Sequence, residues 1–565
     1  MAPMLRSGDS QQSSIKQRCG THSPAIEAGR FRGHEQPEAR QEVEVIMQEC
    51  SAITPYLAVI FTIVLALLAA RHRRRRKTRK QCKLPPSPKL RIPFLGHLFP
   101  LFCGRDLVKK SKRLKSYYGD MFSYEVVGMN TVHLCSYELI REALKKPEVS
   151  SRIPFQKFSN INKVISDIYL HGFHGIVVTE GPEWREHRRF TMKTLKGFGF
   201  GKSSMEQMMN EEVNIFCEQL RADAGSNVDL TNKFNVLVIN SLWRIIGGKR
   251  FDYSDAKFTA LISYVNKGFS AIAPTPRLAL LFLFPFLRNW APELTGFDAM
   301  KKGYHGMYEF LRVEIDKHRA ELDLDNPKDF IDAYLIEMAK KEEREDSDSF
   351  FYKDLGMECL FCVLCDLFLA GSETTATNLL WAVIFLMRHP EIQSKLAQEL
   401  DEVVGRERQP ELADQEEMPF TLAFINEVHR KASIVPLGVQ HWTNSDVRVG
   451  GFTIPKDSIV VPNLWEVHHD PDTWTDPDVF RPERFLNSRG EFVKSERVIP
   501  FSIGARRCPG ETLAKAEIFL FLTNLVQNFN FSTPEDEPTP SLDYQYGFTL
   551  LPQPFTVTIR PKPET

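Results

Sequence analysis

The sequence predicts a mainly α-helical fold with a minor β-sheet region, and three observations lead to this expectation. Two long stretches, 355–387 and 511–529, carry apolar residues at helical spacing, and the first is apolar nearly all round, as in a helix buried in a large core. Alternating apolar and β-branched residues occur only in short pieces, such as 119–135 and 446–461, where Gly or Pro breaks the runs. No repeat period is visible along the chain.

The composition indicates a globular protein and little more. A chain of 565 residues with 42% hydrophobic residues has ample room for a large buried core. Lys and Arg number 72, as do Asp and Glu, and this zero net charge gives no global reason to expect a nucleic-acid partner. The 10 cysteines are too sparse for a disulfide scaffold, so reduced thiols are expected.

The first 100 residues divide into three segments of different character. Residues 1–50 are polar, poor in aromatic residues and expected to be disordered. Residues 51–70 contain an uncharged apolar run that eight Lys and Arg residues follow at once. This order predicts one transmembrane anchor rather than a cleaved signal peptide or a core helix, with the basic side in the cytoplasm. Residues 71–100 form a basic and Pro-rich linker, and residues 101–565 form the globular domain.

A second apolar stretch, Ala271–Trp290, contains three prolines and Arg277, so it cannot be a clean spanning helix. Two interpretations stay open for it. The stretch belongs to the core, or it is a surface loop that dips into the membrane beside the anchor.

The most specific segment is 501–510, FSIGARRCPG. Cys508 lies on a Gly-rich turn just before a helix, where the helix dipole and unpaired backbone N–H groups favour thiolate over thiol. From the residues alone, such a thiolate could be a nucleophile, a redox thiol or a metal ligand. No second Cys stands at C-x-x-C spacing from it, which disfavours the redox interpretation.

The pattern F-x-x-G-x-R-x-C-x-G is complete at Phe501, Gly504, Arg506, Cys508 and Gly510, and it resembles the haem-binding signature of cytochrome P450. The resemblance implies the cytochrome P450 fold and haem b, with Cys508 as the axial iron ligand. A thiolate ligand pushes electron density toward bound oxygen and favours O–O cleavage. The resemblance also implies that Phe501 shields the sulfur, Gly504 permits the tight loop and Arg506 pairs with a haem propionate.

A polar cluster at 372–375 interrupts the apolar helix 355–387. Unpaired polar groups there cost about 1–3 kcal/mol each, so these side chains should line a cavity or bond to the i−4 carbonyl. The sequence A-G-x-[DE]-T-[TS] at 370–375 resembles the oxygen-activating segment of the family. It implies that Glu373 feeds protons and that Thr374 hydrogen-bonds the oxygen at the iron.

Two further groups resemble family patterns. Trp184 and Arg188, one helical turn apart, are expected to donate together to a propionate, and His441 is expected to supply another donor. An E-x-x-R pair on one helix and a later arginine in P-E-R-F are expected to form a buried triad with a structural role, and these residues are Glu427, Arg430 and Arg484.

Three cysteines in a row, Cys359, Cys362 and Cys365, imitate iron–sulfur spacing. They lie in an apolar helical stretch without a nearby fourth Cys, so packing in the core is the favoured interpretation.

The resemblance implies a membrane-anchored haem-thiolate monooxygenase of the animal microsomal type, single-pass in the endoplasmic reticulum, with its catalytic domain in the cytoplasm. Its expected partners are NADPH-cytochrome P450 reductase, cytochrome b5, membrane lipid and a lipophilic substrate such as a steroid, a fatty acid or a xenobiotic. The segments expected to contact that substrate are Ile153–Gly175, Tyr264–Leu281, the helix before Ala370 and the stretch after Pro436. Two alternatives remain, namely a reductase-independent peroxide isomerase and a non-catalytic haem sensor.

Overall fold

The computed structural model describes residues 83–89, 96–97, 106–126, 129–169, 172–199, 203–271 and 276–563. The segment Cys82–Thr565 forms one compact unit. The segment 1–50 and the anchor 51–70 that the sequence predicts lie outside the described residues, as does most of the linker 71–100.

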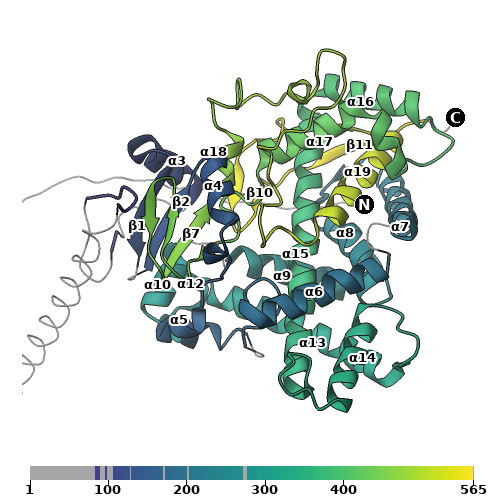
Figure 1. Ribbon diagram of the computed structural model, residues 1–565. Helices are drawn as coiled ribbons and strands as arrows, with labels where there is room; N and C mark the ends of the chain where they lie inside the picture. The colour runs from purple at the N-terminus through teal and green to yellow at the C-terminus, as the bar shows by residue number, and fades with distance from the viewer. Residues whose placement is uncertain are drawn as a thin grey trace, which may run out of the picture. The chain divides into compact units, whose positions relative to one another are not determined.

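Helix α15, Lys353–Arg388, runs through the middle of the unit (Figure 1). It coincides with the apolar stretch that predicts it, and it contacts α8, α13, α17 and α19. Within the described ranges, α15 alone is long and apolar enough to cross a membrane, but half of its most apolar window is buried inside the protein. We therefore assign α15 as the central core helix.

Other helices surround α15 and make the unit mainly helical, as predicted. They are α3 Leu107–Tyr118, α4 Tyr137–Leu144, α5 Ser159–Ile165, α6 Gly181–Gly197, α7 Ser203–Ala222, α8 Thr231–Ile246, α9 Ala256–Ala271, α10 Pro276–Leu283, α11 Leu287–Trp290, α12 Pro292–Thr295, α13 Phe297–Glu321, α14 Phe330–Glu343, α16 Pro390–Val403, α17 Pro419–Ala432, α18 Leu464–His468 and α19 Glu511–Asn528. Short 3₁₀ helices are η1 Pro147–Val149, η2 Phe155–Lys157, η3 Leu412–Glu417 and η4 Pro482–Phe485.

Proline places the start of two helices that later carry the site. Pro182 stands in the first turn of α6 and Pro419 begins α17, positions where the missing N–H would have no helical partner. Helix α17 ends at Ser433, whose φ of 40° is left-handed and turns the chain out of the helix.

In the described part of the chain, four small sheets accompany the helices. The largest has the order β1-β2-β7-β4, in which β2 and β7 are parallel and the other neighbours are antiparallel. Both stretches expected to form strands do so, because β1 and β2 fall within 119–135, β5 and β6 fall within 446–461, and β7 begins there and ends one residue later. The strands are β1 Met121–Val126, β2 Met129–Leu134, β3 Asn227–Val228, β4 His441–Trp442, β5 Val447–Val449, β6 Phe452–Ile454, β7 Ser458–Pro462, β8 Phe529–Ser532, β9 Tyr544–Tyr546, β10 Leu550–Pro552 and β11 Val557–Pro561.

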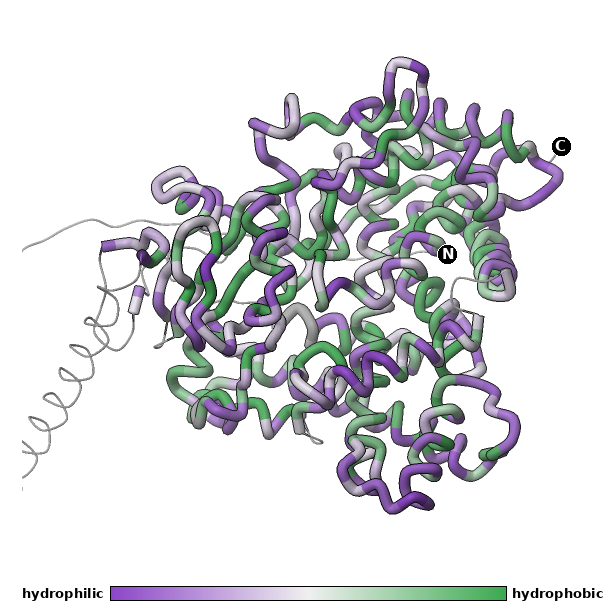
Figure 2. Tube along the Cα trace, in the orientation of Figure 1, coloured by the Kyte–Doolittle hydropathy of each residue, from purple (hydrophilic) through white to green (hydrophobic). Residues whose placement is uncertain are grey.

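Hydrophilic residues gather on the outer loops, whereas hydrophobic segments concentrate toward the interior (Figure 2). The predicted apolar segment Ala271–Trp290 departs from this rule in its described part. Leu281 is fully buried, but Phe284, Phe286 and Trp290 are 44%, 55% and 85% exposed. The described part of the segment is therefore a surface element whose one buried side packs into a small hydrophobic cluster around Leu281.

Candidate functional site

Cys508 lies in a tight loop directly before α19, as the sequence predicts. Its N–H donates to the carbonyl of Phe501 at 3.0 Å, which closes the loop. Gly504 has a φ of 81°, and an added Cβ there would collide with the backbone carbonyl of Leu144 at the end of α4. Gly510 has an ordinary φ of −86°, and its N–H donates to the sulfur of Cys508. The two glycines thus serve different purposes.

The thiol of Cys508 departs from the expectation that helix α19 alone would make it an anion. Cys508 is accessible to solvent, but the surrounding protein removes much of the water around its sulfur, and this desolvation raises its pKa. The Gly510 N–H and the guanidinium groups of Arg188 and Arg507 act in the opposite direction without outweighing it. A bound cation would deprotonate this thiol outright.

Three arginines gather near Cys508 with only backbone carbonyls as acceptors. Arg506 donates to Ser150 at 2.8 Å and to Thr179 at 2.7 Å, and Arg188 donates to the carbonyl of Arg507 at 2.6 Å. Arg152, which the sequence did not single out, donates to three carbonyls, on Val177, Val439 and Gln440.

In the described part of the chain, none of these arginines has a carboxylate at ion-pair distance. Burial and the neighbouring positive charges lower the pKa of Arg152 to about 9 and that of Arg506 to about 10. Such a cluster stabilises an anion that binds among its members.

Trp184 and His441 stand beside this cluster. The Trp184 ring lies 3.9 Å from the Arg506 guanidinium, and its buried Nε1 has no hydrogen-bond partner. His441 is buried and its Nδ1 lies 2.8 Å from the Val149 carbonyl. Burial and the nearby arginines lower its pKa well below the usual range, so the neutral ring donates from Nδ1. Nε2 can donate only after an anion has stabilised the imidazolium.

These residues fit haem well. An orphaned indole N–H and an uncompensated group of arginines suit the two propionates, and an accessible thiol suits the iron. The sequence placed Trp184, Arg188, His441 and Arg506 in this role, and the structure brings all four to one place together with Arg152.

The polar cluster of α15 splits into two groups. Thr374 is half-buried and donates to the carbonyl of Ala370 at 2.7 Å, which was one of the expected arrangements. Ala370 itself is exposed in the middle of this core helix, so the Ala370–Thr374 face borders open space. Glu373 is buried and accepts from the hydroxyl of Thr549 at 2.5 Å, while its Oε2 has no partner. Burial raises the pKa of Glu373 to about 7.

The predicted triad is present, with Glu427 and Arg430 fully buried and Arg484 half-buried. Glu427 accepts from Arg430 at 2.7 and 2.8 Å and from Arg484 at 3.0 Å. Arg430 also donates to the carbonyl of His468, and the His468 ring accepts from the N–H of Ile499 at 3.0 Å. The triad therefore connects α17 to the start of the Cys508 loop.

Asp366 on α15 is a second residue that the sequence did not indicate. Its Oδ2 accepts from the N–H groups of Ile176 and Val177 at 2.6 and 2.9 Å. The same short segment presents its carbonyls to Arg152 and Arg506. Asp366 thus ties the central helix to the loop that carries the arginines.

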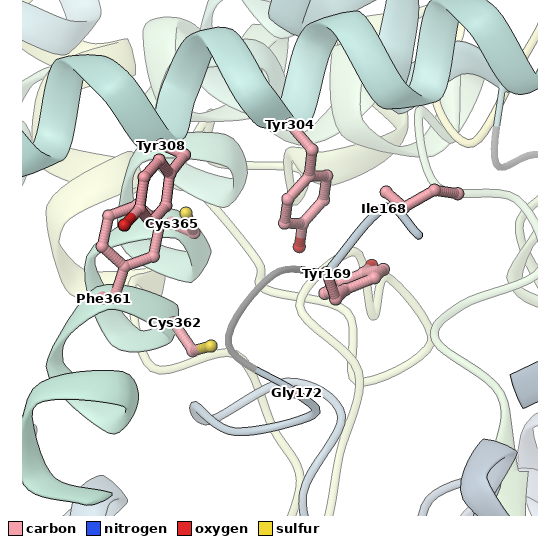
Figure 3. A pocket seen from close by; sticks show the side chains of 8 residues that line it. All are labelled: Ile168, Tyr169, Gly172, Tyr304, Tyr308, Phe361, Cys362 and Cys365. Atoms are coloured by element: carbon pink, nitrogen blue, oxygen red, sulfur yellow. The ribbon is translucent and has the colours of Figure 1, made fainter. Parts of the chain in front are cut away.

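A pocket lies beside the first half of α15 (Figure 3). It is lined by Ile168, Tyr169, Gly172, Tyr304, Tyr308, Phe361, Cys362 and Cys365. The lining includes two of the segments expected to contact substrate, Ile153–Gly175 and the helix before Ala370. The tyrosines of α13 were not expected, and no described residue of the other two expected segments is among those that line this pocket.

Comparison with known proteins decides the family. The family model described as Cytochrome P450 matches residues 85–559. The chain belongs to the cytochrome P450 family. It is 36% identical to Cytochrome P450 2D3 of Rattus norvegicus over 506 residues, which cover 88% of this chain and 96% of that relative. It is 36% identical to Cytochrome P450 2J1 of Oryctolagus cuniculus over 483 residues, covering 84% and 91%. It is 34% identical to Farnesoate epoxidase of Bombyx mori over 484 residues, covering 85% and 94%.

Membership of this family fixes the enzyme class. The protein is a cytochrome P450 of the animal microsomal type, a monooxygenase that binds haem through a cysteine thiolate. The helical unit with small sheets agrees with the cytochrome P450 fold.

Proposed function

We propose that this cytochrome P450 is a membrane-anchored enzyme of the endoplasmic reticulum that oxygenates a lipophilic substrate, with Cys508 as the haem ligand. The observation that carries the proposal is the accessible thiol of Cys508 beside arginines that lack a carboxylate partner. Bound there, haem supplies the activation of O₂, with one oxygen atom going to the substrate.

The arginine cluster is the proposed binding site of the two haem propionates. Arg152, Arg188 and Arg506 would neutralise the two carboxylates, and the free N–H of Trp184 would donate to one of them. His441 would add a donor once a propionate stabilises its charged form. Phe501 and Gly510 hold the Cys508 loop through the contacts described above.

Glu373 and Thr374 are the proposed route for protons. Because the pKa of Glu373 is about 7, its carboxyl group exchanges a proton readily near neutral pH, and its free Oε2 can pass that proton on. The Thr374 hydroxyl donates to Ala370 and keeps its lone pairs for an incoming donor.

Two features support a lipophilic substrate drawn from a membrane. Aromatic and apolar side chains line the pocket of Figure 3, and exposed aromatic residues crowd the segment around Phe286 and Trp290. The name of the Bombyx mori relative indicates that this relative epoxidises farnesoate. NADPH-cytochrome P450 reductase is the proposed electron donor, with cytochrome b5 as a second.

Turnover with different electron sources tests this proposal. The haem-loaded enzyme should oxygenate lipophilic compounds with NADPH and reductase, and Glu373→Gln should consume NADPH with less product because proton supply is impaired. Turnover that needs only a hydroperoxide would favour the peroxide isomerase. Absence of any turnover across steroids, fatty acids and xenobiotics would favour the haem sensor.

A further inference from the structure

A second group of ligand-type side chains lies beside the pocket, away from Cys508. It consists of His174 in the loop before α6, Glu183 on α6 and Cys359 on α15. One ligand atom from each of the three lies within 4.8 Å of the others. Two distant parts of the chain, 174–183 and α15, therefore present nitrogen, oxygen and sulfur to one point.

We propose that His174, Glu183 and Cys359 form a binding site for Zn²⁺. Imidazole, carboxylate and thiolate are the donors that zinc takes in proteins, and three protein ligands leave a fourth position for water. His174 Nδ1 is already 2.9 Å from Glu183 Oε1, so small side-chain movements admit the ion. The opposite nitrogen, Nε2, lies 3.8 Å from Glu358 Oε2. A carboxylate at that place orients a zinc-binding imidazole and fixes its tautomer.

A comparison within the chain shows why this group is the better candidate. His318, Asp329 and Asp332 are similarly close together. There, however, Nδ1 of His318 lies 2.7 Å from the Glu314 carbonyl and Nε2 lies 2.8 Å from Asp329. Both ring nitrogens of His318 are thus already at hydrogen-bond distance from acceptors, whereas Nε2 of His174 is 3.8 Å from Glu358, and the His318 group has no thiol.

Access and proton balance also suit the first group. The side chains of His174, Glu183 and Glu358 are 21%, 16% and 45% exposed, so an ion reaches them from solvent, and buried Cys359 closes the site from below. Binding forms a Zn–N bond, a Zn–O bond and a Zn–S bond. It releases to solvent the proton of the Cys359 thiol, and the imidazole of His174 binds the ion in its neutral form.

Zinc at this place would affect the pocket. Gly172 and Cys362 line the pocket, and the backbone N–H of His174 donates to the Cys362 sulfur. The ion would fasten the loop, α6 and α15 together at the pocket edge and hinder ligand entry. This effect rests on the proposed function, whereas zinc binding itself does not.

Equilibrium dialysis of the haem-loaded full chain against ZnCl₂, with metal analysis, tests the site. We expect one zinc per chain that Cys359→Ser and His174→Ala each weaken by about tenfold or more, while Glu358→Ala weakens it by about tenfold through the orientation of His174. Cys365→Ser is the matched control, because this thiol lies on the same helix outside the group, and it should leave zinc binding unchanged. X-ray absorption should show one sulfur at about 2.3 Å from zinc.

Equal zinc affinity in the native chain, Cys359→Ser and His174→Ala would overturn the site. The carbon monoxide spectrum of each variant confirms that it retains haem, and a variant that loses haem is replaced by Glu183→Gln. Zinc should also lower the affinity for a lipophilic ligand, as measured by spectral titration, in the native enzyme but not in His174→Ala. If zinc binds without this effect, only the influence on the pocket is refuted.

Discussion

The region around Cys508 and the pocket beside the first half of α15 are built by different kinds of interaction. On the Cys508 side, buried charges and hydrogen bonds to backbone groups dominate. Arg430 donates to Glu427 and to the His468 carbonyl, and the His468 ring accepts from the N–H of Ile499, just before Phe501. On the pocket side, packed aromatic rings dominate, with the Tyr169 and Tyr304 centroids 4.2 Å apart. Directional bonds need particular residues at particular spacings, whereas apolar packing accepts many residues.

This difference assigns the reaction chemistry to the Cys508 region and the substrate specificity to the pocket. The enzyme class follows from the Cys508 side, because few arrangements of residues hold a thiolate and two propionates. Substrate choice belongs to the pocket side, where volume and shape decide. Each prediction below tests whether the two sides respond differently to mutation.

The largest effect is expected for Arg430→Ala. Its removal leaves the Glu427 carboxylate buried beside Arg484 alone, which should lower the free energy of unfolding by about 3–5 kcal/mol and reduce haem content. Arg406→Ala is the control, since Arg406 also makes two hydrogen bonds to one carboxylate, on Asp401, but at the surface, and should cost less than about 1 kcal/mol. Denaturant unfolding measures both, and equal losses would contradict the role given to burial.

Gly504→Ala should come next. Alanine at a φ of 81° is strained, and its Cβ would also strike the Leu144 carbonyl. Gly490→Ala separates the two costs, because Gly490 has a φ of 79° with no atom near an added Cβ. We expect about 1–3 kcal/mol for Gly490→Ala and a larger loss, with less bound haem, for Gly504→Ala. Similar losses of unfolding free energy in the two variants would show that the Cys508 loop moves enough to relieve the clash with Leu144.

Asp366 predicts a dependence of stability on pH. Burial raises the pKa of Asp366 from 3.8 in the unfolded chain to about 6. The folded protein therefore holds more protons between these values, and the free energy of unfolding should fall as pH rises through this window, by at most about 1.4 kcal/mol per pH unit. Asp366→Asn should remove this part of the slope while keeping an acceptor for Ile176 and Val177. Unfolding at several pH values checks it, and an unchanged slope would refute the assignment.

The smallest effect is expected on the pocket side. Tyr304→Phe removes the hydroxyl that bonds to Tyr169 and should change the affinity of lipophilic ligands by about fivefold, equivalent to about 1 kcal/mol. The carbon monoxide spectrum should stay the same, because Tyr304 lies on α13 and is not among the residues that hold the Cys508 loop. Tyr117→Phe, 71% exposed, is the control and should change neither quantity. A loss of the thiolate signature in Tyr304→Phe would show that the two sides are coupled.

The sequence anticipated what depends on local spacing. The Cys508 loop, the pair of Glu427 with Arg430 and the two strand-forming stretches are short patterns, and the structure has them where expected. Arg152, Asp366 and Thr549 were not anticipated, because each meets its partners only after distant segments have packed together. The raised pKa of Cys508 has the same origin, since burial depends on the whole fold and outweighs the local helix end.

The most direct test of the central claim is the carbon monoxide difference spectrum of the reduced, haem-loaded enzyme in the native chain and in Cys508→Ser. The native enzyme should show the absorption band characteristic of thiolate-ligated haem, and the variant should lose it, because a serine hydroxyl does not donate charge to the iron as a thiolate does. An unchanged band in Cys508→Ser would contradict the assignment of Cys508 as the ligand.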